Sequence, residues 1–359
     1  MGLFGFLKKD KGATGSKKGF FELSVSAVEK LTHDTVKVVL KVPEDLKNEF
    51  KFIPGQYLDF SVTVNGKDEH RSYSICSGPG EELAIAVKEV SRGTVSKWFN
   101  HEVLPGSTLF VSKPKGSFIL KEGVKKVVAI AAGSGITPIM SIAKDLEKKG
   151  GHLTLFFGNR NRQSILFETE LTGLSNTNVK HYLSAEEHDS YGKGRINKES
   201  FTNEIKADLG LLKADAYFIC GPEQMIIEVA DVLKFFGVAE SKIHFELFTT
   251  PVLMKPHETN VTSNFEGSSK VKVILDSEVA EFELPAKGKT LLEAVEKAGM
   301  DAPYSCKGGV CSSCRAKILK GSAMMTTNFS LTDEDIKKGY ILTCQAHPTS
   351  EELTISFDE

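Results

Sequence analysis

The sequence has no excess of either charge and no long apolar run. Lysine and arginine together number 45, and aspartate and glutamate number 47, so the formal net charge is -2. A nucleic-acid-binding domain usually carries a clear basic excess, and the balance here argues against that class of function. No stretch approaches the ~20 consecutive apolar residues that a membrane-spanning helix needs. We therefore expect neither a nucleic acid nor a membrane as a partner.

The one basic excess lies in the first twenty residues, where five lysines stand against a single aspartate. The apolar run at residues 2–7 is too short to be the core of a signal peptide. Phe6 also stands where N-myristoylation requires serine or threonine. We expect residues 1–20 to form a solvated leader of a cytoplasmic protein.

Cysteine is scarce, with six residues, but four of them fall within the last 54 residues. In an intracellular protein such a cluster binds metal more often than it forms disulfides. The histidines are scattered and no Glu-x-x-His pair is present, so we do not expect a di-iron oxygenase centre in this chain. Hydrophobic residues make up 40%, and a length of 359 residues predicts two or three domains.

The pattern of residues 21–122 is typical of an antiparallel β-barrel. Short alternating runs at residues 35–40, 57–62 and 83–87 are separated by turn pairs such as Asn65-Gly66. Many short strands punctuated by such turns predict an all-β unit of this kind.

Residues 123–247 show a different pattern. Continuous apolar runs at 127–132, 153–157 and 216–220 alternate with helical spacing, as at 138–149 and 223–236. Runs of this kind are expected of strands buried on both faces, so the region predicts an α/β doubly wound parallel sheet.

The remaining chain divides into a linker at residues 248–268 and a small C-terminal domain at 269–359. The linker carries no clear periodicity. After it, a hairpin around Asp276-Ser277, a helix at 290–298 and a last strand at 353–357 are predicted.

The cysteines of the C-terminal domain have the strongest signal in the chain. Their spacing is Cys-x4-Cys-x2-Cys followed by one distant cysteine, which is that of plant-type 2Fe–2S ferredoxins. The four predicted iron ligands are Cys306, Cys311, Cys314 and Cys344. One loop can deliver three thiolates only if its backbone folds tightly, and Gly308 and Gly309 supply that freedom.

The alternative for these cysteines is a structural zinc site. Such sites normally pair two short knuckles with two cysteines each, whereas Cys344 stands alone. In a cluster, the amides of the loop and the hydroxyls of Ser305, Ser312 and Ser313 could hydrogen-bond to the sulfurs.

Two further segments predict a bound flavin nucleotide. Arg71, Ser72, Tyr73 and Ser74 end a predicted strand and offer a fork for a pyrophosphate, a stacking face and hydroxyls. An arginine and a tyrosine alternating on a strand also occur as a plain solvent face. About twenty residues later a helix begins, and amides and hydroxyls at a helix start suit a phosphate. The residues of this second segment are Thr94, Val95 and Ser96.

A turn that suits a dinucleotide follows the first buried strand. The residues that form it or open the next helix are Gly133, Ser134, Gly135, Thr137 and Pro138. The third glycine of the usual fingerprint is missing, and a strand–helix turn without ligand is the alternative. A second group at the carboxyl end of a strand, where ligands of open sheets bind, comprises Cys220, Gly221 and Pro222.

Taken together, these segments resemble the ferredoxin–NADP reductase superfamily, in the group with a C-terminal plant-type ferredoxin domain. The resemblance covers residues 21–358 and implies a barrel for FAD, a sheet domain for NAD(P)H and an α+β β-grasp ferredoxin fold. Residues 130–138, 158–160, 306–311 and 327–331 are similar to segments of the reductases that serve phenylacetyl-CoA ring epoxidation.

The resemblance also implies roles for single residues. Arg71 and Ser96 would bind the FAD phosphates, Tyr73 would lie against the isoalloxazine, and Ser74 would hydrogen-bond near its N5. Backbone groups that would line the flavin belong to Ala86, Val87 and Lys88. Thr137 and Cys220 would border the nicotinamide.

Glu246 resembles the carboxylate that completes a Ser–Cys–Glu group in plant-type reductases. The terminal aromatic residue of those proteins has no counterpart, because this chain continues into the linker. Phe248 is the candidate substitute.

The choice of coenzyme is predicted from the loop after the second buried strand. Arg160, Arg162 and Ser164 lie there, and no acidic residue precedes Glu168. Arginines accommodate the 2′-phosphate of NADPH, whereas a carboxylate would favour NADH, so NADPH is predicted over NADH. The alternative is that both arginines are ordinary surface charges.

The resemblance implies an electron-transfer flavoenzyme that contains FAD and a 2Fe–2S cluster and oxidises NADPH. Its acceptor would be a di-iron or non-haem oxygenase component on another polypeptide, first of all that of a phenylacetyl-CoA epoxidase. Two alternatives stay open: a reductase of a ring-hydroxylating or steroid-hydroxylating oxygenase, and a redox-sensing flavoprotein without turnover.

Overall fold

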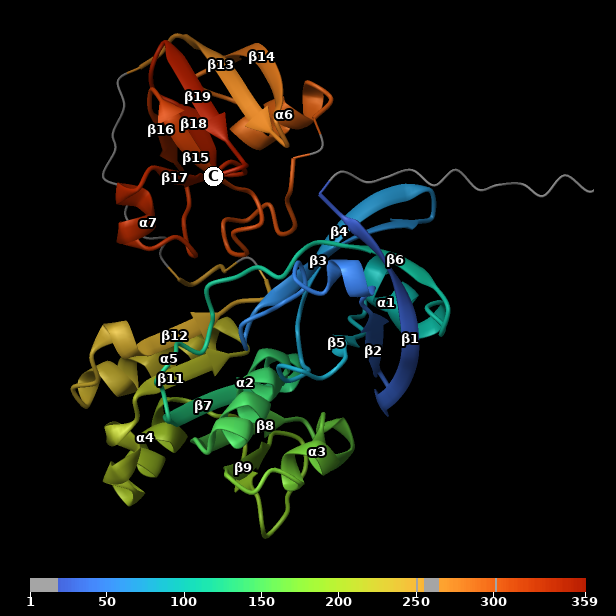
Figure 1. Ribbon diagram of the computed structural model, residues 1–359. Coiled ribbons are helices and arrows are strands. Elements are labelled where there is room, and N and C mark those ends of the chain that lie inside the picture. Colours follow the sequence, from blue (N-terminus) through green and yellow to red (C-terminus); the bar gives the residue numbers. More distant parts are fainter. Residues whose placement is uncertain (1–18, 250, 255–264, 301) are drawn as a thin grey trace, which may run out of the picture.

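The computed structural model describes residues 19–249, 251–254, 265–300 and 302–359. The predicted leader thus lies outside the described residues except for Gly19 and Phe20. The described residues form three units, each built on its own main sheet (Figure 1).

The first unit is the predicted antiparallel barrel. Its strands follow the order β4-β3-β6-β1-β2-β5. Their bounds are β1 (Phe21–Thr32), β2 (Thr35–Lys41), β3 (Tyr57–Val64), β4 (Lys67–Ser74), β5 (Leu83–Lys88) and β6 (Thr108–Val111). An isolated bridge between Ile75 and Ile85 joins the two edges. Helix α1 (Thr94–His101) packs its Phe99 into the apolar interior.

The second unit is the predicted doubly wound parallel sheet, in the order β10-β9-β8-β7-β11-β12. Its strands are β7 (Lys126–Ala132), β8 (His152–Asn159), β9 (Thr177–Leu183), β10 (Gly192–Lys193), β11 (Ala216–Cys220) and β12 (Ile243–Glu246). Helices α2 (Ile136–Lys149) and α3 (Glu168–Thr172) pack on one face, and α4 (Lys198–Ala207) and α5 (Glu223–Phe235) on the other. Helix α2 begins two residues before the predicted start, because the turn at Gly133–Gly135 is itself helical.

The strand order reverses between β7 and β11. Parallel sheets bind ligands at the carboxyl ends of the strands at such a point. The two predicted dinucleotide segments follow directly after these two strands.

The third unit has a five-stranded mixed sheet in the order β14-β13-β19-β15-β17 and a two-stranded one, β16-β18. Its strands are β13 (Ser268–Leu275), β14 (Glu278–Pro285), β15 (Arg315–Lys320), β16 (Ala323–Met325), β17 (Tyr340–Leu342), β18 (Ala346–Pro348) and β19 (Glu352–Ser356). Its helices are α6 (Leu291–Lys297) and α7 (Asp333–Lys337). Asp276 and Ser277 both have positive φ, which gives the hairpin turn its twist. Strand β13 begins at Ser268, so the linker ends one residue earlier than predicted.

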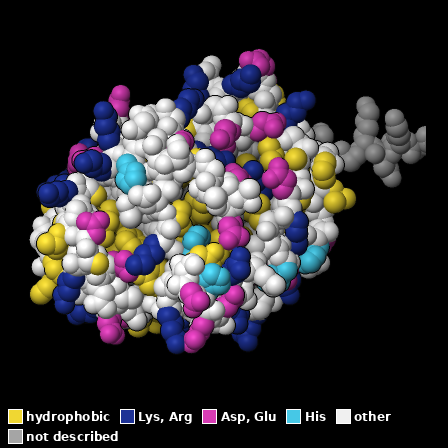
Figure 2. Space-filling view, turned by 90° about the horizontal axis from the view of Figure 1, so that it is seen from below, with side chains coloured by type: hydrophobic (Ala, Val, Ile, Leu, Met, Phe, Trp, Pro, Cys, Tyr) yellow, Lys and Arg dark blue, Asp and Glu magenta, His cyan; other side chains and the backbone are white. Residues whose placement is uncertain are grey.

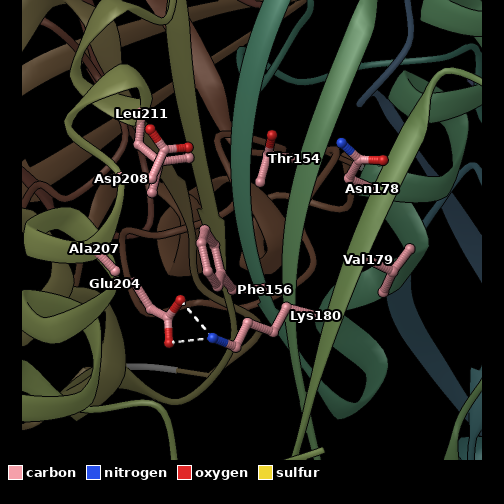
Figure 3. Close-up of a pocket in the computed structure, with 9 residues that line it drawn as sticks. All are labelled: Thr154, Phe156, Asn178, Val179, Lys180, Glu204, Ala207, Asp208 and Leu211. Atoms are coloured by element: carbon pink, nitrogen blue, oxygen red, sulfur yellow. Dashed lines mark hydrogen bonds and ion pairs between the residues drawn. The ribbon is translucent and has the colours of Figure 1, made fainter. Parts of the chain in front are cut away.

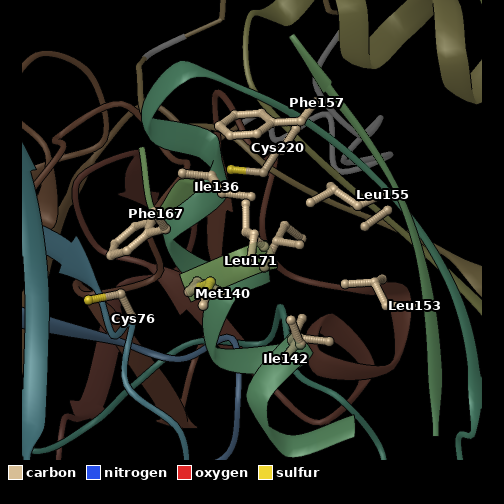
Figure 4. Close-up of a cluster of buried hydrophobic side chains, with 14 of the residues drawn as sticks. Cys76, Ile136, Met140, Ile142, Leu153, Leu155, Phe157, Phe167, Leu171 and Cys220 are labelled. Atoms are coloured by element: carbon tan, nitrogen blue, oxygen red, sulfur yellow. The ribbon is translucent and has the colours of Figure 1, made fainter. Parts of the chain in front are cut away.

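One continuous apolar core joins the barrel to the parallel sheet (Figure 4). It contains Ala84 and Phe118 from the barrel side together with Ile136 and Met140 of α2. Phe118 meets Phe218 of β11 edge-on, with ring centroids 5.0 Å apart. The two units are therefore joined mainly by close apolar packing.

On the face shown in Figure 2, acidic and basic side chains are interspersed and neither sign gathers into a large patch. Within the described ranges, every helix is too short or too polar to cross a membrane.

Candidate functional site

The loop that carries three of the predicted iron ligands is tightly folded. Lys307, Gly309 and Ser312 have φ between 50° and 75°, in the left-handed region. Gly308 does not, so the expectation that it supplies this freedom was wrong, and Lys307 and Ser312 take that conformation instead. The resulting turns aim amides at sulfur: Gly308 N–H lies 3.3 Å and Val310 N–H 3.4 Å from Cys306 Sγ.

The four thiols stand as two pairs. Cys306 interacts with Cys311, and Cys314 with Cys344. Nowhere in the described part of the chain do three Cys, His, Asp or Glu side chains converge on one point. Two pairs suit two irons with two thiolates each, whereas one zinc ion would need four converging ligands.

The environment of each pair favours one thiolate. A hydrogen bond from the Cys311 thiol, together with the loop amides, lowers the pKa of Cys306. The Cys314 thiol similarly lowers the pKa of Cys344. The pKa values of the partner thiols Cys311 and Cys314 are raised in return, so these two would lose their protons on binding iron.

The flavin segments meet on the barrel. Tyr73 on β4 contacts Phe99 of α1 edge-on at 5.2 Å, and burial raises its pKa. Helix α1 begins at Thr94 without a side-chain cap, which leaves its first amides available for a phosphate. The hydroxyl of Ser96 instead accepts from Val90 N–H at 3.2 Å and shapes the preceding turn. The Arg71 guanidinium is paired with Glu69 at 3.0 Å.

The backbone of β5 lies next to this place. Ala86 and Val87 are buried, and Lys88 reaches Asp34 at 3.5 Å. The Val87 carbonyl accepts a hydrogen bond from Asn100 of α1, which ties the strand to the helix.

The predicted Ser–Cys–Glu group is brought together where barrel and parallel sheet meet. Ser74 Oγ lies 3.4 Å from Glu246 Oε2, and Glu246 pairs with Cys220 across β11 and β12. Burial raises the pKa of Glu246 to about 8, and burial next to Glu246 raises that of the Cys220 thiol. At neutral pH both groups are therefore protonated.

The glycine turn touches the same place. A Cβ at Gly135 would stand 2.1 Å from the Cys220 carbonyl oxygen, so only glycine allows this approach. Ser134 accepts a hydrogen bond from the Thr137 hydroxyl through its carbonyl at 3.0 Å, which closes the turn. Figure 4 shows Cys220 beside Ile136 at the start of α2. Phe248 lies two residues after β12 and is 47% exposed.

Of the predicted coenzyme-phosphate residues, Arg162 borders a hollow of about 590 Å³, which it shares with Glu168 and Glu186. Arg160 is exposed, while the Ser164 hydroxyl is used in a capping box with Asn161. The Arg162 amide donates to Glu186 Oε2 at 2.9 Å. An acidic residue thus lies beside Arg162. It comes from the loop after β9, whereas the coenzyme prediction was based on the loop after β8.

Asn159, at the end of β8, offers an unused donor near this hollow. Its side chain is 8% exposed, and its Nδ2 has no hydrogen-bond partner in the described part of the chain. A buried amide of this kind costs stability unless a ligand or water accepts from it, which fits a nucleotide at the carboxyl end of the sheet.

A smaller hollow of about 220 Å³ lies between the sheet and α4, away from all predicted site residues (Figure 3). Lys180 and Glu204 form an ion pair of 2.7 Å at its edge. Because Lys180 and Glu204 pair with each other and Asp208 accepts from the Gly210 amide, we assign no site there.

Sequence reasoning missed the contacts that join the barrel to the cluster loop, although it named Ser72 for the flavin and Ser305 and Ser313 for the cluster sulfurs. Ser72 of β4 lies 2.8 Å from Ser305, and Ser313 donates to Asp59 of β3 at 3.1 Å. Polar residues that alternate along a strand carry no sign that another domain will cover them, so no sequence signal could have found this contact.

The start of the linker is anchored. Glu223, at the first position of α5, accepts hydrogen bonds from the amides of Val252, Leu253 and Met254 at 2.6–2.9 Å. The part of the linker that follows the parallel sheet is therefore tied to the helix beside Cys220.

Three family models match the chain. They describe an oxidoreductase FAD-binding domain at residues 22–119, an oxidoreductase NAD-binding domain at 129–231 and a 2Fe-2S iron-sulfur cluster binding domain at 273–349. The order of the three matches agrees with the order of the three sheets.

Curated relatives match over nearly the whole chain. A component of the 1,2-phenylacetyl-CoA epoxidase of Escherichia coli (strain K12) is 36% identical, over 94% of this chain and 98% of its own. The ferredoxin reductase component of the 3-ketosteroid-9-alpha-monooxygenase of Rhodococcus rhodochrous is 32% identical, over 93% and 96%.

Solved structures share the fold. Phthalate dioxygenase reductase, described as a modular structure for electron transfer from pyridine nucleotides to [2Fe-2S], has a TM-score of 0.57 at 26% identity. That match covers 94% of this chain and 98% of the other. An intact type IV self-sufficient cytochrome P450 monooxygenase has a TM-score of 0.68 at 24% identity, over 94% of this chain and 41% of that longer one. The predicted combination of barrel, parallel sheet and ferredoxin domain is confirmed.

Proposed function

The chain belongs to the ferredoxin–NADP reductase superfamily, in the group with a C-terminal 2Fe–2S ferredoxin domain, and from this premise we propose that it is the reductase of a multicomponent oxygenase. It takes electrons from a reduced pyridine nucleotide and delivers them to an oxygenase on another polypeptide. We also propose the domain limits 21–122, 123–247 and 269–359.

One observation carries the proposal: a single strand, β4, contacts both other units. Ser74 lies 3.4 Å from Glu246 of the parallel sheet, and Ser72 lies 2.8 Å from Ser305 of the cluster loop. Residues two apart on a strand point to the same face. A flavin bound at this end of β4 would therefore lie close to both the nicotinamide and the cluster.

Bound FAD and a 2Fe–2S cluster would supply hydride acceptance and single-electron transfer, which side chains cannot provide. The side chains hold and orient. Ser74, Cys220 and Glu246 would border the reacting rings, and the close approach at Gly135 would let the coenzyme reach the backbone. Tyr73 with Phe99 would wall one side of the flavin and exclude water. Cys306, Cys311, Cys314 and Cys344 would hold the irons.

Anaerobic titration of the purified, cofactor-loaded protein tests this. We expect NADPH to bleach the flavin and to produce the electron paramagnetic resonance signal of a reduced cluster. Flavin and cluster that both stay oxidised with NADPH and with NADH would favour the redox-sensing alternative.

We propose NADPH as the donor, supported by Arg160 and Arg162. Glu186 beside Arg162 is the specific observation that favours NADH, because a carboxylate there can bind the free ribose hydroxyl. The ratio of kcat/KM for the two coenzymes decides between NADPH and NADH. If Glu186 binds the ribose, Glu186→Ala should lower kcat/KM for NADH and leave kcat/KM for NADPH equal or higher.

For the acceptor we propose the di-iron component of a phenylacetyl-CoA epoxidase, supported by the relative at 36% identity. A steroid monooxygenase is the second candidate, since its reductase is 32% identical. Reconstitution with each oxygenase separates them: product that forms at a rate limited by this reductase with only one partner identifies the acceptor class.

A further inference from the structure

The face of the barrel that meets the ferredoxin domain is built around one buried carboxylate. Asp59 of β3 is 1% exposed. Its Oδ1 accepts hydrogen bonds from Ser72 at 2.6 Å and from Ser313 at 3.1 Å, and its Oδ2 pairs with Lys115 at 3.2 Å. Ser313 belongs to the cluster loop, so this carboxylate joins the two domains.

Tyr57 adds a second contact from the same strand and the same face. Its hydroxyl donates a hydrogen bond to the carbonyl oxygen of Cys311, one of the four proposed iron ligands. Tyr57 and Asp59 together therefore hold the loop at two points, Cys311 and Ser313.

The chemistry of the contact explains why these groups are needed. A buried carboxylate costs free energy unless donors surround it, and here one donor comes from the other domain. Only the docked arrangement supplies Ser313 to Asp59 and the Cys311 carbonyl to Tyr57. The carboxylate thus makes docking specific for a single pose.

An aromatic stack at the rim fixes the same pose. His70 of β4 stacks on Tyr304 of the ferredoxin domain, with centroids 4.8 Å apart and planes 11° apart. Lys307 of the cluster loop lies over the same Tyr304 ring at 4.0 Å.

We propose that Asp59 and Tyr57 are positioning residues for electron transfer: they hold the cluster loop against the strand that also carries Ser72 and Ser74. The inference rests on the proposed function of electron flow from FAD to the cluster. Tunnelling rates fall exponentially with distance, so loss of the pose slows cluster reduction. Hydride transfer would take place where Ser74 meets Glu246 of the parallel sheet, a contact in which the cluster loop has no part.

Stopped-flow reduction of the loaded, full-length protein under anaerobic conditions tests the proposal. In Asp59→Ala we expect flavin reduction by NADPH within about twofold of the unmodified protein. We expect cluster reduction to be slower by about tenfold or more, because a hydrogen bond to a charged group is lost. Asp59→Asn keeps one acceptor and should recover much of the rate. Glu49→Ala, which breaks an exposed ion pair with Lys113 on the same barrel, is the matched control and should change neither rate.

Small-angle X-ray scattering gives a readout that does not depend on activity. We expect a larger radius of gyration for the Asp59→Ala/Tyr57→Phe double variant than for the Glu49→Ala control. If Asp59→Ala does not fold, Tyr57→Phe alone removes one hydroxyl and should still slow cluster reduction by about threefold or more.

Three outcomes separate the possibilities. Normal cluster reduction together with an unchanged radius of gyration in the variants overturns the role of Asp59 and Tyr57. Slow reduction of flavin and cluster alike in Asp59→Ala also overturns it, because the residue would then act on the whole barrel. An unmodified protein whose cluster never becomes reduced would contradict the proposed function instead.

Discussion

The barrel makes two interfaces, and they differ in chemistry. Against the parallel sheet it packs apolar side chains such as Ala84 and Phe118 into one continuous core with α2. Against the ferredoxin domain it presents Tyr57, Asp59 and Ser72, which bind hydroxyls and a carbonyl of the cluster loop.

This difference indicates which of the two interfaces stays closed and which can open. Apolar surface gains stability by leaving water, in proportion to the area buried. Hydroxyls and carboxylates exchange their partners for water at small net cost, so a polar contact contributes specificity more than strength. We infer that the barrel and the parallel sheet act as one body, and that the ferredoxin domain is held by a contact that can open.

The largest effect is expected from Cys314→Ser. Loss of the Cys314 thiol, which pairs with Cys344, should abolish cluster assembly and with it electron delivery. Flavin reduction by NADPH should persist, because it takes place where the barrel meets the parallel sheet. Iron content and electron paramagnetic resonance measure cluster assembly, and stopped-flow absorbance measures flavin reduction.

The matched control for this variant is Cys76→Ser. Cys76 is buried, and its side chain donates to the Ala84 carbonyl, a bond that serine preserves. The Cys76→Ser variant should retain both cofactors. Loss of the cluster in both variants, or a normal iron content in Cys314→Ser, would contradict the assignment of ligands.

Phe118→Ala tests the apolar interface. Phe118 is 4% exposed and packs on Phe218, so its truncation should lower the free energy of unfolding by about 3–5 kcal/mol. The single tryptophan, Trp98, lies on α1 and reports barrel unfolding in urea by fluorescence. Phe235→Ala, at a residue 83% exposed, should change stability by less than about 0.5 kcal/mol. Equal losses of stability in Phe118→Ala and Phe235→Ala would contradict the conclusion that this interface stays closed.

Glu246 is a titratable group at this junction, which the ion pairs Lys37–Glu170 and Lys144–Glu81 also cross. Its pKa of about 8 lies above that of an unfolded glutamate, so the folded state keeps a proton that the unfolded chain releases. Stability from this group is therefore full below the unfolded value, falls as the pH rises toward 8, and is then level. In the flavin-free protein, Glu246→Gln should gain about 1–2 kcal/mol relative to the unmodified chain between pH 5.5 and 8.5, after allowance for its partial exposure. Urea unfolding measures both proteins at both pH values. A difference in free energy of unfolding that is the same at pH 5.5 and at pH 8.5 would contradict the raised pKa of Glu246.

The smallest effect on stability is expected from Tyr57→Phe. It removes one hydrogen bond at the polar interface and should cost at most about 1.5 kcal/mol in the same fluorescence assay. A loss as large as that of Phe118→Ala would mean that both interfaces contribute equally to stability, and the comparison would fail.

The features that sequence predicted are local ones. Alternation predicted the barrel strands, continuous apolar runs predicted β7, β8 and β11, and the spacing of four cysteines predicted the cluster domain. Each of these signals lies within one element or one loop, so the chain itself displays it.

What escaped prediction depends on contacts between distant segments. Asp59 looks like an ordinary outward residue of an alternating strand until Ser313, 254 positions later, covers it. Glu186 reaches Arg162 only because β8 and β9 end side by side. The roles of Ser74, Cys220 and Glu246 stay a prediction, although the structure brings the three together.

The anchor at Glu223 sets how far the iron-bearing domain can travel. Only 14 residue steps separate Met254, bound to that carboxylate, from Ser268, where β13 begins. Even a fully extended chain of this length spans no more than about 50 Å. A released ferredoxin domain therefore stays within about this distance of the barrel. Its effective concentration at the flavin face remains high, so it can dock again quickly.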